Sequence, residues 1–232
     1  MNCLSAQLRG TSSSNKRYGV IYADPPWNFR NFSEKGTGRN AVAHYQCMDF
    51  AQMAAMEPQR LAAKDCVLFM WATDPLLLKA LDLIHAWGFT YKTVGFYWAK
   101  TNKRADLEAL SFDDFFTGLG YWSRANVEQC LLATRGSPPR MAKDVKRLII
   151  SPRREHSRKP DEVYRRIERL ARGPYLELFA RQSPEGWDRY GNQAELFDGC
   201  GSTHWQSSRS QKERRLGAGL RRLSCSATGA GW

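Results

Sequence analysis

Five apolar runs along the chain predict five β-strands. Several are almost continuously apolar instead of alternating, which is typical of strands that are covered on both faces by helices. The runs span residues 18–23, 66–72, 91–100, 127–134 and 175–181.

Two segments between these runs carry helical periodicity. Residues 74–87 place Asp74 where it can cap a helix, Pro75 in its first turn and Gly88 just past its end. Residues 161–172 repeat apolar side chains at helical spacing and begin with two acids. Strands that alternate with helices predict an α/β fold with a Rossmann-like, doubly wound and mostly parallel sheet.

Other parts of the chain lack such periodicity. Residues 28–43 and 105–122 are predicted to be loops of the length that binding loops and lids use. Residues 1–17 are polar, and residues 194–232 are rich in Ser, Gly and Arg, which predicts a disordered basic tail. The sequence therefore predicts one domain over residues 18–193 between a polar N-terminal segment and this tail.

The segment Asp24-Pro25-Pro26-Trp27 directly follows the first predicted strand. A carboxylate and the Pro25 carbonyl can accept hydrogen bonds from an amine, and an indole face can stack on a flat ring. The alternative is a proline-rich turn that merely ends the strand. Because an acid, two prolines and an aromatic residue coincide at a strand end, we favour a site that holds an amino-bearing ring.

The charge of the chain narrows the class of partner. Its formal net charge is +12, from 35 basic and 23 acidic residues, which favours an anionic partner such as nucleic acid. The six cysteines are scattered without a CxxC pair, so no metal site is predicted, and reduced thiols suggest the cytoplasm. No apolar stretch is long enough to span a bilayer, so no membrane association is expected.

The segment around Asp24 and several later ones together resemble the MT-A70 family of S-adenosylmethionine-dependent adenine N6 methyltransferases. The resemblance covers roughly residues 18–193 in the order of the family's motifs. Besides residues 24–27, it is carried by Phe69-Met70-Trp71-Ala72, Trp98-Ala99-Lys100-Thr101-Asn102, Gly120-Tyr121-Trp122, Glu128-Gln129-Cys130-Leu131, the block from His156 to Tyr164, Glu177-Leu178-Phe179-Ala180-Arg181 and Gly191-Asn192-Gln193.

The resemblance implies a class I methyltransferase fold with a permuted motif order, in which the catalytic strand comes first and the cofactor strand last. It implies that S-adenosyl-L-methionine is the cofactor. The implied catalytic residues are Asp24, Pro25, Pro26 and Trp27. The implied cofactor-binding residues are Asp24, Lys159, Glu177, Phe179, Arg181, Asn192 and Gln193.

The resemblance also implies contacts with the target base and its strand. The implied substrate-binding residues are Trp27, Tyr45, Lys100, Asn102 and Glu128. A base within a duplex cannot reach such a site, so the target is expected to be single-stranded or flipped out. The tryptophans at positions 71, 98 and 122 are interpreted equally well as core residues or as ligand contacts.

Three functions are compatible with the sequence. The favoured one is methylation of the N6 amine of adenine in DNA. The same chemistry on RNA is the first alternative. A nucleic-acid-binding subunit that has lost catalysis is the second, and the intact Asp24–Trp27 segment together with Lys159 and Asn192 argues against it.

Overall fold

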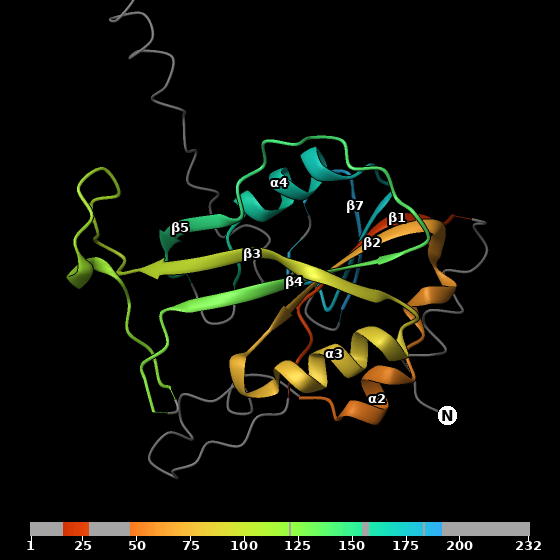
Figure 1. Cartoon of the computed structure of the whole chain (residues 1–232), viewed down its shortest axis with the longest axis horizontal. Helices are drawn as coiled ribbons and strands as arrows, with labels where there is room; N and C mark the ends of the chain where they lie inside the picture. The colour runs from red at the N-terminus through yellow and green to blue at the C-terminus, as the bar shows by residue number, and fades with distance from the viewer. Residues whose placement is uncertain (1–15, 28–46, 121, 155–157, 183, 192–232) are drawn as a thin grey trace, which may run out of the picture. The chain divides into compact units, whose positions relative to one another are not determined.

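The structure is a computed structural model, and it describes residues 16–27, 47–120, 122–154, 158–182 and 184–191. Its elements follow the chain in the order shown in Figure 1. They are β1 (Tyr18–Ala23), α2 (Phe50–Ala54), η3 (Pro58–Arg60), β2 (Ala62–Ala72), η4 (Asp74–Leu76), α3 (Leu77–Ala86), β3 (Thr90–Thr101), η5 (Phe112–Asp114), β4 (Val127–Arg135), β5 (Leu148–Pro152), α4 (Glu162–Leu170), β6 (Tyr175–Leu178) and β7 (Trp187–Tyr190).

Within the described ranges, seven strands form one sheet in the order β5-β3-β4-β2-β1-β6-β7. Strand β1 pairs in parallel with both β2 and β6, and β3–β5 and β6–β7 are also parallel. Only β4 runs antiparallel to its neighbours β2 and β3 in this sheet. Helices α2 and α3 lie on one side of the sheet and α4 on the other (Figure 1). This arrangement confirms the predicted Rossmann-like, doubly wound and mostly parallel sheet.

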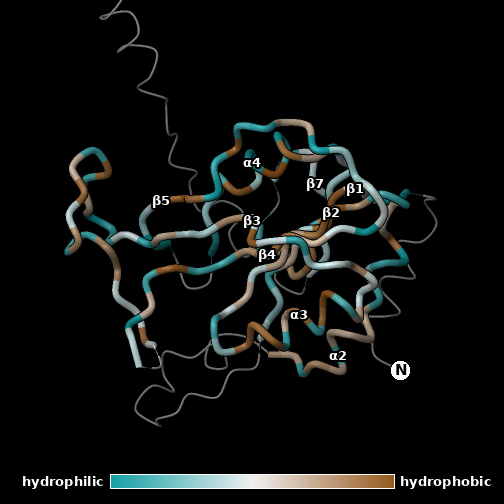
Figure 2. The backbone as a smooth tube through the Cα atoms, viewed as in Figure 1, coloured by the Kyte–Doolittle hydropathy of each residue, from teal (hydrophilic) through white to brown (hydrophobic). Residues whose placement is uncertain are grey.

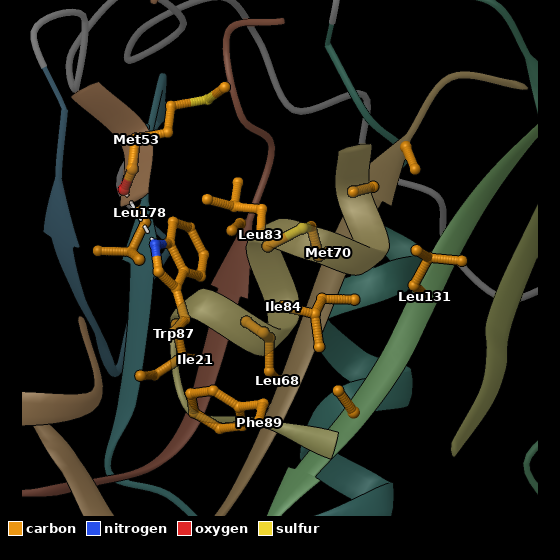
Figure 3. Close-up of a cluster of buried hydrophobic side chains, with 14 of the residues drawn as sticks. Ile21, Met53, Leu68, Met70, Leu83, Ile84, Trp87, Phe89, Leu131 and Leu178 are labelled. Carbon is orange, nitrogen blue, oxygen red and sulfur yellow. Dashed lines mark hydrogen bonds between the residues drawn. The ribbon is translucent and has the colours of Figure 1, made fainter. Parts of the chain in front are cut away.

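One buried cluster, here called the α3 face, fills the space between the sheet and helices α2 and α3 (Figure 3). Ile21 from β1 and Leu68 from β2 contribute to it, and both are fully buried. Leu83 and Trp87 reach it from α3 and its C-terminal end, and the Trp87 indole donates a hydrogen bond of 2.9 Å to the Met53 carbonyl. Each tryptophan N–H that is buried needs such an acceptor, so this contact also fixes α2 against α3.

The opposite cluster, here called the α4 face, uses the alternate residues of the same strands. Tyr22 and Trp71 lie next in sequence to residues of the α3 face but point to the other side, because successive strand side chains alternate. Val163 and Ile167 of α4 are fully buried against them. Both faces of β1 and of residues 66–72 of β2 are covered, and these stretches are mostly apolar (Figure 2).

The elements depart from the sequence-based expectations in identifiable places. Strand β6 ends at Leu178 and not at the expected Arg181, because Phe179 adopts a left-handed conformation with φ of 60°. Asp74 does not cap α3, since its carboxylate instead accepts a hydrogen bond of 3.1 Å from the Gln129 side chain. Strands β5 and β7 and helix α2 were not predicted, as they are only four or five residues long.

Gly88 ends the α3 segment as predicted, with φ of +74°. The predicted loop at residues 105–122 contains only the short helix η5 among its described residues. The helices in the described ranges are all too short or too polar to cross a membrane. The predicted tail at residues 194–232 lies outside the described residues.

Candidate active site

The candidate site lies where β1 and β6 end side by side. The two strands are parallel and their last residues, Ala23 and Leu178, are paired in register. The chain leaves β1 toward β2 on one side, while β6 lies on the other, so this edge is a topological switch point. Ligands of open α/β sheets bind at the carboxyl ends of strands at such a point.

A shallow pocket that is open to solvent occupies this position. Five of the residues that line this pocket were predicted from the sequence to bind the cofactor. The fold brings them together from three separate segments of the chain. They are Asp24, Lys159, Glu177, Phe179 and Arg181.

The Asp24 carboxylate is held by two cations. The Lys159 ammonium donates to both of its oxygens, at 3.0 and 2.9 Å, and the Arg181 guanidinium lies 3.8 Å away. Lys159 also lies 5.3 Å from the centre of the Trp71 ring, which adds a cation–π contact. Burial lowers the pKa of Lys159, but the nearby carboxylates of Asp24 and Glu128 outweigh it and raise that pKa. Lys159 is therefore a permanent cation at the side of Asp24.

A second carboxylate extends this network toward β3 and β4. Glu128, at the start of β4, lies 3.5 Å from Lys159 and forms a closer ion pair with Lys100. Burial acts to raise the pKa of Glu128, but Lys159 and Lys100 together lower it to about 2. Glu128 is thus ionised and shares Lys159 with Asp24. The Lys159 ammonium is therefore within ion-pair distance of both carboxylates at once.

A third carboxyl group, Glu177 of β6, behaves differently. Its side chain lines the pocket, is 5% exposed and accepts a hydrogen bond of 2.9 Å from the Tyr164 hydroxyl. Burial raises the pKa of Glu177 to about 8, Asp24 acts in the same direction, and Tyr164 and Arg181 oppose it. Near neutral pH this group therefore holds a proton for much of the time.

Phe179, which lines the pocket, and Gly191 occupy constrained backbone positions. Phe179 has a positive φ of 60°, which is uncommon for a residue other than glycine and marks a constrained position. A Cβ atom on Gly191 would lie 2.6 Å from the backbone of Ala180, so only glycine allows the chain after β7 to approach so closely. Residues 192 and 193, predicted to bind cofactor, follow directly, although they lie outside the described residues.

The structure contradicts the stacking role predicted for Trp27. Its side chain is only 6% exposed and belongs to the α3 face, and its indole N–H donates to the Trp71 carbonyl at 3.1 Å. A base needs an open ring face on which to stack, and this one is covered by core side chains. The indole bond instead anchors the turn after β1, in which the backbone N–H of Trp27 donates to the Pro25 carbonyl at 2.8 Å.

Pro25 and Pro26 are buried, and both carbonyls take part in backbone hydrogen bonds. Pro26 accepts from the Met48 N–H at 3.0 Å, which ties the segment to the chain before α2. A carbonyl has two lone pairs, so the Pro25 oxygen retains capacity for a second donor. The segment is therefore held from both sides and presents Asp24, whose side chain is 16% exposed, to the pocket.

The remaining predicted substrate residues are placed apart. The Asn102 side chain donates to the Asp113 carbonyl at 3.0 Å and stabilises the loop between β3 and β4, outside the pocket. Lys100 reaches the site only through Glu128. Trp71 and Trp98 are buried, whereas Trp122 is 99% exposed. Tyr45, Asn192 and Gln193 lie outside the described residues.

Four pocket residues were missed by the sequence analysis: Tyr22, Arg158, Tyr164 and Gln182. Tyr22 was counted as part of a continuous apolar strand, and Tyr164 ended the block from His156 that resembles the family, with no role assigned to it. Arg158 precedes Lys159 and could have been found from that position. In the described part of the chain, no group of three or more His, Cys, Asp or Glu side chains is arranged to hold a metal ion.

The sequence matches the MT-A70 family over residues 18–193. The Type II methyltransferase M.MunI of a Mycoplasma species is 30% identical over 194 residues, covering 76% of this chain and 77% of that protein. The N(6)-adenosine-methyltransferase MT-A70-like of Arabidopsis thaliana is 32% identical, and the N(6)-adenosine-methyltransferase catalytic subunit METTL3 of Homo sapiens is 28% identical. This chain aligns with only 24% and 28% of the lengths of these two proteins. Because the family match covers well over half of its length, this chain belongs to the MT-A70 family.

Proposed function

We propose that the protein transfers a methyl group from S-adenosyl-L-methionine to the N6 amine of adenine in DNA. The observation that carries this proposal is the Asp24 carboxylate, which is bracketed by Lys159 at 2.9 Å and Arg181 at 3.8 Å in a pocket between β1 and β6. A carboxylate at this place can accept a hydrogen bond from an amine that enters from the solvent side.

The pocket suits a ligand that carries charges of both signs. Its lining combines Asp24 and Glu177 with Lys159, Arg158 and Arg181. The amino-acid end of S-adenosylmethionine has a carboxylate, an ammonium and a sulfonium, so each charge meets a possible partner. Lys159 would hold the carboxylate, and Phe179 would supply an apolar wall. We assign the ribose and adenine to Arg181, Asn192 and Gln193.

When bound, the cofactor supplies an electrophilic methyl group on a positively charged sulfur. The work of the protein is to hold the adenine amine in line for transfer, because correct placement of two reactants contributes about 7 to 11 kcal/mol. Asp24 and the Pro25 carbonyl accept the two N–H bonds of the amine and so orient its lone pair. Asp24 then receives a proton from the methylated nitrogen, directly or through water. Its place between two cations fixes its orientation.

The target strand is proposed to enter beside Glu128 and Lys100, with Asn102 holding the loop and Tyr45 contributing a further contact. The base must be single-stranded or flipped out, which costs a few kcal/mol. Positive charge on the chain, +12 in total, attracts the phosphates.

The share of each relative's length that aligns with this chain favours DNA as the substrate. The chain spans about three quarters of M.MunI, a Type II methyltransferase, but about a quarter of the N(6)-adenosine-methyltransferases. A chain that aligns with about three quarters of M.MunI is expected to share its type of substrate, which we propose to be DNA. We place the protein in the cytoplasm, where free thiols such as Cys66 and Cys130 stay reduced.

The test is to incubate the full chain with methyl-labelled S-adenosylmethionine and separate pools of DNA and RNA, then to identify the labelled nucleoside. We expect label in DNA as N6-methyladenine. Label in RNA alone would move the substrate from DNA to RNA and keep the chemistry. No label in either pool, with cofactor binding intact, would contradict the proposed transfer.

A further inference from the structure

Three polar side chains that line the pocket form a hydrogen-bonded chain. Gln182 donates to the Tyr164 hydroxyl at 2.9 Å, and that hydroxyl donates to Glu177 Oε2, also at 2.9 Å. A hydroxyl has a single proton to donate, so the bond from Gln182 leaves the Tyr164 proton directed at Glu177. The three residues come from α4, from β6 and from the segment just after β6.

The Tyr164 ring is held rigidly. It is 6% exposed and meets Tyr22 and Trp187 edge-on, with ring centres 5.4 and 5.2 Å away. Aromatic rings prefer this arrangement, which restricts rotation of the ring. The hydroxyl therefore has a fixed position before any ligand enters.

Glu177 destabilises the fold at its position. It lies on the α4 face of β6, where neighbouring buried positions carry aromatic and aliphatic side chains, and burying a carboxyl group there costs stability. Local choices that oppose stability are expected at functional sites. The carboxyl group of Glu177 lines the pocket, and its Oε2 atom accepts the hydrogen bond from Tyr164. That bond fixes the orientation of the carboxyl group and therefore the position of its other oxygen.

We infer that Tyr164 and Gln182 are positioning residues for the cofactor, which orient the Glu177 carboxylate to receive a cationic group of the bound molecule. The cation is the α-ammonium or the sulfonium of S-adenosylmethionine. This inference rests on the proposed function for the identity of the cofactor, and it adds two residues to which neither the sequence nor the comparisons assign a role.

Several charged and titratable groups face Glu177 and set its response to pH. Asp24 at the end of β1 raises the pKa of Glu177, after burial itself, whereas Tyr164 from α4 and Arg181 after β6 lower it, and the result is about 8. Tyr22, Arg158 and Lys159 line the same pocket. Loss of the Tyr164 hydroxyl therefore raises the pKa of Glu177 further and leaves less of the carboxylate form near neutral pH.

The experiment measures dissociation constants by calorimetry for S-adenosylmethionine and for S-adenosylhomocysteine, which keeps the ammonium but lacks the sulfonium charge. The full chain, Tyr164→Phe and Tyr175→Phe are compared between about pH 6.5 and pH 8.5. Tyr175 is the matched control, since its hydroxyl donates to the Ala171 carbonyl at 3.0 Å and its ring stacks on the same Trp187. The ratio of variant to unaltered constants cancels the titration of the ligand itself.

We expect Tyr164→Phe to weaken binding about tenfold near pH 7 and less as the pH rises, with Tyr175→Phe unchanged. Equal losses for both ligands identify the ammonium as the cation, and a loss for S-adenosylmethionine alone identifies the sulfonium. In a Glu177→Gln background the Tyr164 effect should largely disappear, because Tyr164 acts through that carboxyl group.

A binding ratio for Tyr164→Phe that is near one, or independent of pH, would overturn the inference. So would an undiminished effect in the Glu177→Gln background. If Tyr164→Phe fails to fold, as judged by thermal melting, Gln182→Met provides the second test, with a loss of about threefold expected and no loss contradicting the inference. Failure of the unaltered protein to bind S-adenosylmethionine would instead overturn the proposed function itself.

Discussion

The two faces of the central sheet are built from the same strands but differ in chemistry. On the α3 face, Ile21, Leu68 and Leu83 are fully buried in an apolar cluster. The α4 face places Tyr22, Trp71 and Glu177 at corresponding positions and leads into the pocket. Apolar side chains would stabilise the second face more. The contrast indicates that one face supplies the stability that allows the other to carry polar groups.

The pocket side of this comparison is tested most directly at Asp24. We expect Asp24→Asn to lower the rate of methyl transfer by on the order of 10²–10³-fold, since an amide presents an N–H where an acceptor is needed. The measurement is labelled methyl transfer at saturating cofactor, with S-adenosylhomocysteine binding as a check on the pocket. Asp74→Asn is the matched control on an exposed turn, where the carboxylate bonds to Gln129. A normal rate in Asp24→Asn, or an equal loss in the control, would remove Asp24 from the mechanism.

The α3 face is tested by Leu83→Ala. Leu83 is fully buried in this cluster, so the cavity left by the change should cost about 2 to 5 kcal/mol in the free energy of unfolding. Urea unfolding measures the loss, and Leu78→Ala on the same helix, with a side chain that is 77% exposed, should cost little. We expect transfer per folded molecule to stay within about twofold. A comparable loss of cofactor affinity would show that the two faces are not independent.

Trp27 belongs to the α3 face but directly follows the Asp24 segment, and Trp27→Phe separates a structural role from a stacking role. The phenyl ring keeps an aromatic face but loses the N–H that bonds to the Trp71 carbonyl, so we expect a loss of about 1 to 2 kcal/mol in stability. Trp87→Phe, which loses the bond to the Met53 carbonyl, should cost a similar amount. Only the Trp27 change should also slow transfer, by about tenfold or less, because its turn positions Asp24.

Urea unfolding and methyl transfer, measured on Trp27→Phe and Trp87→Phe, distinguish the structural role of Trp27 from a stacking role. Unchanged stability in Trp27→Phe, together with weaker binding of DNA, would restore the stacking role that the buried ring argues against.

The segment around Trp27 also illustrates which features could be predicted from the sequence and which could not. The strand before it was predicted with the correct ends, Tyr18 and Ala23, because both of its faces are buried and its residues are apolar throughout. Whether an aromatic ring that follows a strand is buried or exposed depends on tertiary contacts, and the local sequence pattern does not encode these. For Trp27 the contact is with the carbonyl of Trp71, which is distant in the sequence. The meeting of Asp24 with Lys159, 135 residues apart, came from the resemblance to a family and not from periodicity.

Short or half-exposed elements were missed for a related reason. Strand β5 buries only Ile149 fully and has exposed residues on either side, so it gives no sustained apolar run. The Tyr164 hydroxyl was invisible within a helical repeat, in which only the ring contributes to the apolar stripe. Sequence patterns report burial of apolar surface, and they do not report where a polar atom at the tip of a buried side chain finds its partner.

The smallest effects concern two carboxyl groups with opposite pH dependence. The folded protein lowers the pKa of Glu128 from 4.5 to about 2, so Glu128 contributes stability above about pH 4.5, which is lost as the pH falls toward 2. For Glu177 the pKa rises from 4.5 to about 8. The folded state then holds a proton that the unfolded chain has released, and stability declines as the pH rises from about 4.5 to 8. One group anchors Lys159, whereas the other opposes folding at neutral pH.

Replacing Glu128 and Glu177 by glutamine should therefore change the free energy of unfolding in opposite directions. We expect Glu128→Gln to lower the free energy of unfolding near pH 7 by about 1 kcal/mol, with the difference vanishing as the pH falls toward 2. Glu177→Gln, which can still accept from Tyr164, should match the unaltered protein near pH 4 and exceed it by about 1 kcal/mol near pH 8. Urea unfolding at these pH values gives both curves. If Glu177→Gln is no more stable than the unaltered protein near pH 8, the α4 face does not sacrifice stability at Glu177, and its contrast with the α3 face is one of composition alone.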